Sequence, residues 1–160
     1  MLVPAAARCV VVLAAAGGWW LPTGASGESR TGSGLRVAVD VGHSQARPGA
    51  RSATGKSEHD FNRRFAEELV ARSESWRDLT LFMLTGAKLS LRDRPDQAAQ
   101  KGADLFLSIH HDSVSRKYIQ HWEHEGQRLA YSDAFKGYSL FVWEDGARAK
   151  ESLAAASSCP

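Results

Sequence analysis

The chain has 160 residues, which suits one domain with a hydrophobic core and is too short for two. Apolar residues make up 43% of it and charged residues 24%, as in ordinary globular proteins. The formal net charge is only +2, and no run of Lys or Arg occurs, so the composition argues against nucleic-acid binding.

The N-terminal residues differ from the rest of the chain. Arg8 is the only charge before Glu28, and it precedes an apolar stretch from Cys9 to Leu21. Small residues follow around Ala25. This order predicts a secretory signal peptide over residues 1–25 and an exported protein, periplasmic or extracellular. The apolar stretch is short for stable membrane insertion; an uncleaved N-terminal anchor is the alternative interpretation.

Residues 26–34 are rich in Gly and Ser and indicate a flexible tether, so one folded domain is predicted over residues 35–160. Once the signal peptide is removed, Cys159 is the one remaining cysteine, which excludes an internal disulfide. A metal bound by this domain therefore needs His and carboxylate ligands.

The predicted elements of this domain alternate between strands and helices. Apolar runs of strand length predict strands over residues 36–41, 79–84, 104–109 and 138–143. Helical patterns begin near Ser57, which can cap its helix with Asp60, and cover residues 94–101 and 147–156. This alternation indicates an α/β fold in which a twisted, mostly parallel sheet is flanked by helices.

The first predicted helix carries Phe61, Phe65 and Leu69 at a spacing of four, which predicts its buried stripe. Residues 115–137 break the alternation of elements and are expected to form a surface insertion near the site. The aromatic residues of this insertion either contact sugar or peptide or cover the sheet: Tyr118, Trp122, Tyr131 and Phe135.

Three side chains are candidates for a metal site at one edge of the sheet. His43 follows the first predicted strand by two residues, and His110 directly follows the strand over residues 104–109. Glu58 falls in the first turn of the first helix and is expected to face the sheet. Two imidazoles and one carboxylate form a catalytic zinc set with a fourth position for water. Taken singly, each residue is more typical of an ordinary loop histidine or a helix-dipole contact.

Several residues near these candidates have roles that the sequence leaves undecided or only suggests. Asp40 either orients the His43 ring or caps the strand end. His59 and His111 are expected to face outward, and Arg94 is expected to anchor its helix. The H-x-x-H of His121 and His124 lacks a third partner and is weak as a metal motif.

A series of motifs runs in order along the domain: Val39-Asp40-Val41-Gly42-His43, Pro48-Gly49-Ala50, Glu58, Arg94 with Ala98, and Ser108-Ile109-His110. With these motifs the chain, from about Arg36 to Ala156, resembles the zinc-dependent N-acetylmuramoyl-L-alanine amidases of the amidase-3 class. The resemblance implies that His43, Glu58 and His110 hold one zinc ion. It also implies that the enzyme acts on peptidoglycan and cuts the amide between N-acetylmuramic acid and L-alanine.

The chain departs from the family's pattern in three places. Ser44 to Arg47 replace a Gly-rich loop with an Asp before Pro-Gly-Ala, and Asp112 replaces the usual Asn. The family's last strand carries a Glu that works with the zinc-bound water, and by the resemblance it would lie beyond Pro160. We therefore expect the catalytic domain to be incomplete at its C-terminus, assign no catalytic acid–base residue, and expect the 160-residue chain to be a poor or inactive amidase. Three glutamates remain in places that do not match: Glu123, Glu125 and Glu144.

Two other functions remain open. A domain that keeps zinc but lacks the acid–base group can serve as a non-catalytic wall-binding or regulatory domain. A zinc hydrolase of peptide ends is the third interpretation, but such enzymes carry their first His and Glu a few residues apart, whereas 14 residues separate His43 from Glu58. The sequence does not identify an activator protein.

Overall fold

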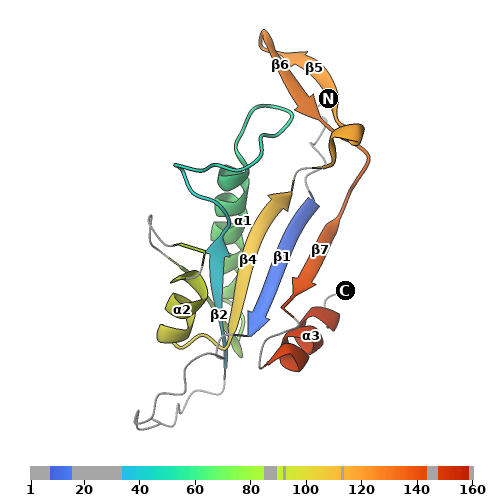
Figure 1. The fold of residues 1–160 in the computed structure, drawn as a ribbon. Helices are drawn as coiled ribbons and strands as arrows, with labels where there is room; N and C mark the ends of the chain where they lie inside the picture. Colours follow the sequence, from blue (N-terminus) through green and yellow to red (C-terminus); the bar gives the residue numbers. More distant parts are fainter. Residues whose placement is uncertain are drawn as a thin grey trace.

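The computed structural model describes residues 8–15, 34–84, 90–91, 93–112, 114–143 and 148–158. The elements occur in the following order (Figure 1): β1 (Arg8–Ala15), β2 (Leu35–Val41), α1 (Glu58–Ser73), β3 (Leu79–Met83), α2 (Asp93–Gln100), β4 (Leu105–Asp112), a 3₁₀ turn η1 (Arg116–Tyr118), β5 (Gln120–His124), β6 (Gln127–Tyr131), β7 (Tyr138–Val142) and α3 (Ala149–Ser157).

The main sheet has five strands in the order β3-β2-β4-β1-β7. β2 pairs in parallel with both β3 and β4, and β1 pairs in parallel with β7. Only the pairing of β1 with β4 is antiparallel. β5 and β6 form a separate antiparallel hairpin. The predicted fold class, an α/β domain with a mostly parallel sheet flanked by helices, is confirmed.

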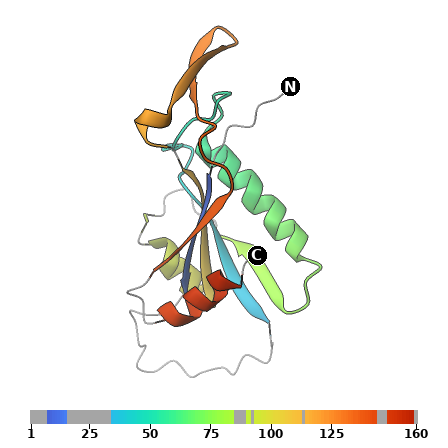
Figure 2. The ribbon, with the colours of Figure 1, turned by 90° about the vertical axis from the view of Figure 1, so that its right-hand side faces the viewer.

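The helices cover both faces of this sheet. α1 lies on one face, and α2 and α3 lie on the other (Figure 2). Val37 and Val39 of β2 pack with Ala66 on the α1 side, whereas Ala38 packs with Ala98 on the α2 side. A strand that is apolar on both faces suits this position between two layers. Among the described residues, no helix combines the length and apolar character needed to span a membrane.

The start of α1 matches its prediction, but its buried stripe does not. Ser57 is the N-cap, and its hydroxyl oxygen accepts a hydrogen bond from the Asp60 backbone N–H at 3.2 Å. Phe65 is 44% exposed, so the predicted stripe of Phe61, Phe65 and Leu69 is wrong at this position, whereas Leu69 packs against the core. The buried positions of α1 are Glu58, Asn62, Ala66 and Ser73. The helix is thus rotated so that two polar side chains face the sheet in its first turns.

β1 comes from the predicted signal peptide. Its residues pair with β4 from Arg8 opposite Asp112 to Ala15 opposite Leu105. β1 is also the strand that joins β7 to the rest of the sheet. The remainder of the predicted signal peptide, and the tether up to residue 33, lie outside the described residues. Cleavage near Ala25 therefore stays a prediction.

Candidate metal centre

Three side chains from three elements meet at the carboxyl ends of β2 and β4. His43 lies just after β2, Glu58 is the first residue of α1, and His110 lies within β4. The His43 Nε2 atom is 3.0 Å from Glu58 Oε1, and the His110 Nδ1 atom is 3.2 Å from the same oxygen. The structure thus brings together the three residues that the sequence proposed.

The donor atoms of this group fit one small metal ion. One ligand atom of each residue lies within 4.8 Å of the other two. Ligand atoms about 2.1 Å from a tetrahedral zinc are separated by about 3.4 Å, so only small shifts are needed. The Glu58 side chain is 5% exposed, while His43 and His110 are 32% and 26% exposed. The group is therefore closed on the carboxylate side and open to solvent on the imidazole side.

Glu58 is held as a carboxylate. Burial raises the pKa of its carboxyl, but a hydrogen bond with His110 and two from backbone N–H groups lower it by more. The backbone donors are Ala50, at 3.0 Å from Oε2, and His111, at 3.1 Å from Oε1. With the nearby His43 as a further contribution, the pKa falls from 4.5 to about 2. A carboxylate that stays ionised at neutral pH is a competent metal ligand.

This lowered pKa predicts an acid-sensitive contribution to the stability of the metal-free protein. Unfolding returns the Glu58 pKa from about 2 to 4.5, so between these values the unfolded chain binds more protons and stability rises with pH. The contribution is complete above about pH 4.5 and is lost as the pH falls toward 2. The free energy of unfolding, measured by urea denaturation across this range, should depend more steeply on pH in the unchanged chain than in Glu58→Gln. The same pH dependence in both proteins would contradict the prediction.

Backbone geometry around His43 is strained and tightly packed. His43 has φ 68°, a left-handed conformation that is uncommon for a residue with a Cβ. Gly49 has φ +77°, and a Cβ there would lie 2.6 Å from Glu58 Oε2 and 2.8 Å from His43 Cδ2. Only glycine fits this position, because the loop passes directly over both side chains.

Gly49→Ala is therefore expected to weaken metal binding by at least about tenfold, since the new methyl group displaces two of the three ligands. Gly102→Ala is the matched control, because Gly102 has φ +70° and a Cβ there would meet nothing within 4 Å. Both variants carry the same kind of backbone strain, of about 1 kcal/mol. Metal titration followed by competition with a chelator measures the difference. Equal affinities for the two variants would contradict the role given to Gly49.

Arg94 of α2 fixes the backbone that carries His43. Its Nη1 donates to both carboxylate oxygens of Asp40, at 3.0 and 3.1 Å, and to the Val41 carbonyl at 3.0 Å. Its Nη2 donates to the His43 carbonyl at 3.1 Å. Asp40 also accepts from the Ser108 hydroxyl at 2.7 Å. Asp40 thus holds the end of β2, which is one of the two roles predicted for it. Arg94 anchors its helix as predicted, and it also holds the backbone of the metal centre.

The predictions that His59 and His111 face outward are wrong. His111 is half-buried, with Nδ1 2.6 Å from Asn62 Oδ1 and its ring 5.8 Å from that of Phe61. Burial lowers the pKa of His111 from its ordinary value and so favours the neutral ring. The Nδ1 of His59 lies 3.3 Å from the Gly42 carbonyl, which also accepts from Asn62 Nδ2 at 3.0 Å. These contacts tie α1 to the ends of β2 and β4.

Sequence reasoning missed Asn62, although a signal was present. Asn62 lies four residues after Glu58, so the two side chains share one face of α1. A polar residue one turn from a proposed ligand, on the same face, is a candidate to support it. Because Phe61 and Phe65 are apolar, the buried face was predicted about one position away from this polar pair.

The insertion over residues 115–137 contains η1 and the β5–β6 hairpin, which projects beyond the carboxyl ends of β2 and β4 (Figure 1). The indole N–H of Trp122 donates to the Ala53 carbonyl at 2.8 Å and thereby fastens the hairpin to the loop before Glu58. The Trp122 ring stacks on His124 with centroids 5.0 Å apart. The insertion therefore lies beside the site, as predicted.

The H-x-x-H of this hairpin forms no metal site. His121 and His124 lie three positions apart on β5 and so project from opposite faces. Within the described ranges, the only group of three or more side chains spaced for a metal is His43, Glu58 and His110.

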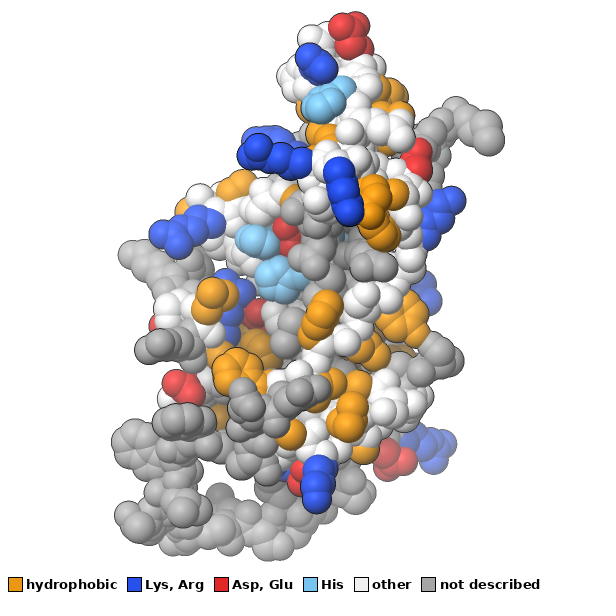
Figure 3. Space-filling model, turned by 45° about the vertical axis from the view of Figure 1, so that its right-hand side comes forward, with side chains coloured by type: hydrophobic (Ala, Val, Ile, Leu, Met, Phe, Trp, Pro, Cys, Tyr) orange, Lys and Arg blue, Asp and Glu red, His pale blue; other side chains and the backbone are white. Residues whose placement is uncertain are grey.

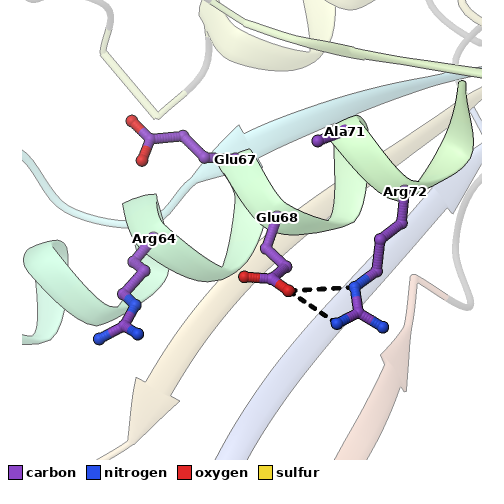
Figure 4. Close-up of a pocket in the computed structure, with 5 residues that line it drawn as sticks. All are labelled: Arg64, Glu67, Glu68, Ala71 and Arg72. Carbon is purple, nitrogen blue, oxygen red and sulfur yellow. Dashed lines mark hydrogen bonds and ion pairs between the residues drawn. The ribbon is translucent and has the colours of Figure 1, made fainter.

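One surface hollow of about 410 Å³ lies apart from these residues (Figure 4). All its lining residues belong to α1, and Arg72 Nη2 donates across it to Glu68 at 2.7 Å. Exposed i,i+4 ion pairs of this kind contribute little to the stability of the fold. The hollow is lined by Arg64, Glu67, Glu68, Ala71 and Arg72, and contains none of the three candidate ligands.

A family model described as N-acetylmuramoyl-L-alanine amidase matches residues 37–159. The chain belongs to this amidase family. The match includes all three residues of the candidate metal centre and confirms the resemblance drawn from the sequence motifs. No curated protein and no solved structure matches the chain. Membership supports a general amidase role on peptidoglycan.

Within this amidase domain, no second carboxylate reaches the metal centre among the described residues. Glu58 is the one acidic side chain that hydrogen-bonds to His43 or His110 there. Glu123 lies on β5, on the face opposite Trp122, and Glu125 lies in the hairpin turn. Glu144 falls outside the described residues.

Proposed function

We propose that the chain is a zinc-dependent hydrolase that cleaves the amide bond between N-acetylmuramic acid and L-alanine in peptidoglycan. The observation that carries this proposal is the convergence of His43, Glu58 and His110 at one edge of the sheet in a member of this amidase family. Two imidazoles with one carboxylate suit zinc, whereas magnesium and calcium prefer oxygen ligands alone.

The chain's own residues would prepare the site for this chemistry. Glu58 is ionised and buried, and the partly exposed imidazoles of His43 and His110 leave one side open for substrate. The Arg94 and Asn62 contacts hold the backbone of this edge, so the ligand atoms are positioned before a metal binds. When bound, zinc would supply Lewis acidity toward a carbonyl and acidify a water molecule.

Product analysis on purified peptidoglycan tests the proposal and its rivals together. Stem peptides released by the zinc-loaded chain, even if slowly, should carry a new N-terminal L-alanine, and removal of zinc by a chelator should stop the release. Release of single amino acids from peptide ends would instead indicate the peptide-end hydrolase. Binding to peptidoglycan without any cleavage would overturn the enzyme proposal in favour of the wall-binding domain. If cleavage occurs, Glu123→Gln and Glu125→Gln identify whether either glutamate transfers protons.

We also propose that the protein is exported to the periplasm or the extracellular space, with cleavage near Ala25. Support comes from the order of Arg8, the apolar stretch and the small residues, which is typical of a signal peptide. N-terminal sequencing of the extracytoplasmic protein is expected to begin close to Ser26. Recovery of an intact N-terminus in the cytoplasm would contradict this prediction.

A further inference from the structure

Two segments that follow the ligand-bearing strands carry positive charge and no negative charge. One is the loop over residues 43–57, and the other is residues 114–119 after β4. All five basic side chains of these segments are exposed. We call this group the basic rim: Arg47, Arg51, Lys56, Arg116 and Lys117.

The basic rim lies at the same end of the sheet as the metal centre. Its first segment begins at His43, passes over Glu58 at Gly49 and ends at the N-cap Ser57. Its second segment follows directly after the strand that carries His110. Figure 3 shows histidine and acidic side chains below the projecting hairpin, with several Lys and Arg side chains around them.

These cations are not neutralised within the described structure. None of the five takes part in an ion pair there, in contrast to Arg63 and Arg72 of α1, which pair with glutamates. Arg51 donates to the Gly55 carbonyl at 3.0 Å, and the Lys117 ammonium lies 4.8 Å from the Tyr118 ring centroid. Exposed positive charges without an acidic partner raise the local electrostatic potential, so their position beside a site favours an anionic ligand.

We propose that the basic rim binds the carboxylates of the peptidoglycan stem peptide and so selects stem peptides whose carboxylates are free over those that are amidated. This inference rests on the proposed function, because it places the stem peptide beside the metal centre. Arg47 directly precedes Pro48 and Gly49, and Gly49 passes over Glu58 and His43, so its charge lies on the loop that covers the metal centre. Arginine and carboxylate form strong charge-assisted hydrogen bonds, and exposed pairs chiefly determine selectivity and salt dependence.

The test compares two synthetic muramoyl peptides of one sequence, with free or with amidated carboxylates. Their dissociation constants are measured by fluorescence polarisation on the metal-free chain. The free form is expected to bind roughly three- to tenfold more tightly, and the difference should shrink as salt is raised. Arg47→Gln with Arg116→Gln should remove most of the preference. Arg72→Gln with Arg77→Gln is the control of equal charge, because Arg72 lies in the last turn of α1 and Arg77 follows that helix, at its far end from Glu58.

Equal binding of the two peptides, or an unchanged preference in the rim variant, would overturn the inference. Tighter binding of a phosphodiester wall polymer than of the free stem peptide would also overturn it, because the rim would then serve another ligand. These outcomes are separate from the proposed function, which is judged by zinc-dependent amide cleavage. Amide cleavage without a preference for free carboxylates overturns only the role proposed for the basic rim. A preference for free carboxylates without cleavage overturns only the proposed enzyme function.

Discussion

His110→Ala is expected to bind zinc at least about 100-fold more weakly than the unchanged chain and to lose amide hydrolysis with the metal. His110 supplies one of the three ligand atoms that lie together in the candidate metal centre among the described residues. Catalytic zinc sites usually have three protein ligands, so the two that remain cannot complete the set. Zinc content after dialysis, zinc affinity against a chelator and peptide release are measured on the same samples.

His121→Ala is the matched control for this variant. It removes an exposed imidazole from the hairpin, where the structure shows no metal group, and should leave zinc binding unchanged. Glu58→Gln is the second ligand variant, because it removes the ligand charge while keeping nearly the same side-chain shape. Unchanged zinc stoichiometry in a folded His110→Ala protein would show that His110 is not a zinc ligand.

Deletion of residues 1–25 is expected to lower the free energy of unfolding by at least about 3 kcal/mol, because several net hydrogen bonds of about 1 kcal/mol are lost with β1. β1 pairs with β4 from Arg8 to Ala15 and with β7 from Cys9 to Leu13. Without it, β7 loses its strand partner in the described sheet and the edge of β4 is freed. The metal centre should survive, since β4, which carries His110, still pairs with β2 and still packs against α1 through Ile109 and Ala66.

Urea denaturation measures the stability change, and hydrogen exchange locates it. Amides of β7 should lose protection in the shorter chain, whereas amides of β2 should stay protected. A chain lacking only residues 1–7 retains β1 and is the control. Equal protection of β7 in the two chains would show that β1 does not hold it. If export proceeds with cleavage near Ala25, the mature protein is this less stable form.

The sequence predicted the site better than it predicted the sheet. His43 and His110 lie at strand ends, and Ser57 fixes the start of α1, so local signals pointed to one edge of the sheet, and the family resemblance singled out the three candidate ligands there. β1 was missed because a short apolar run suits a signal peptide and a buried strand equally well, and periodicity cannot separate them. The choice of strand neighbour depends on long-range pairing, which no local pattern contains.

Two further misses have identifiable causes. His111 follows His110 in an extended strand and so projects to the other face, but that face is covered by α1 through Asn62 and Phe61. The β5–β6 hairpin lacks a strong alternating pattern, yet its Glu125-Gly126 turn, with φ 50° and 73°, has the geometry of a two-residue hairpin loop. A glycine after a polar residue was the available signal.

X-ray absorption at the zinc K-edge of the zinc-loaded chain tests the central claim most directly. The His43–Glu58–His110 site predicts two imidazole nitrogens at about 2.0–2.1 Å and oxygen ligands at about 2.0–2.2 Å, with no sulfur. His110→Ala should remove this signature, and His121→Ala should preserve it. A zinc–sulfur distance of about 2.3 Å, or a shell made of oxygen alone, would contradict the account, because the metal would then lie elsewhere.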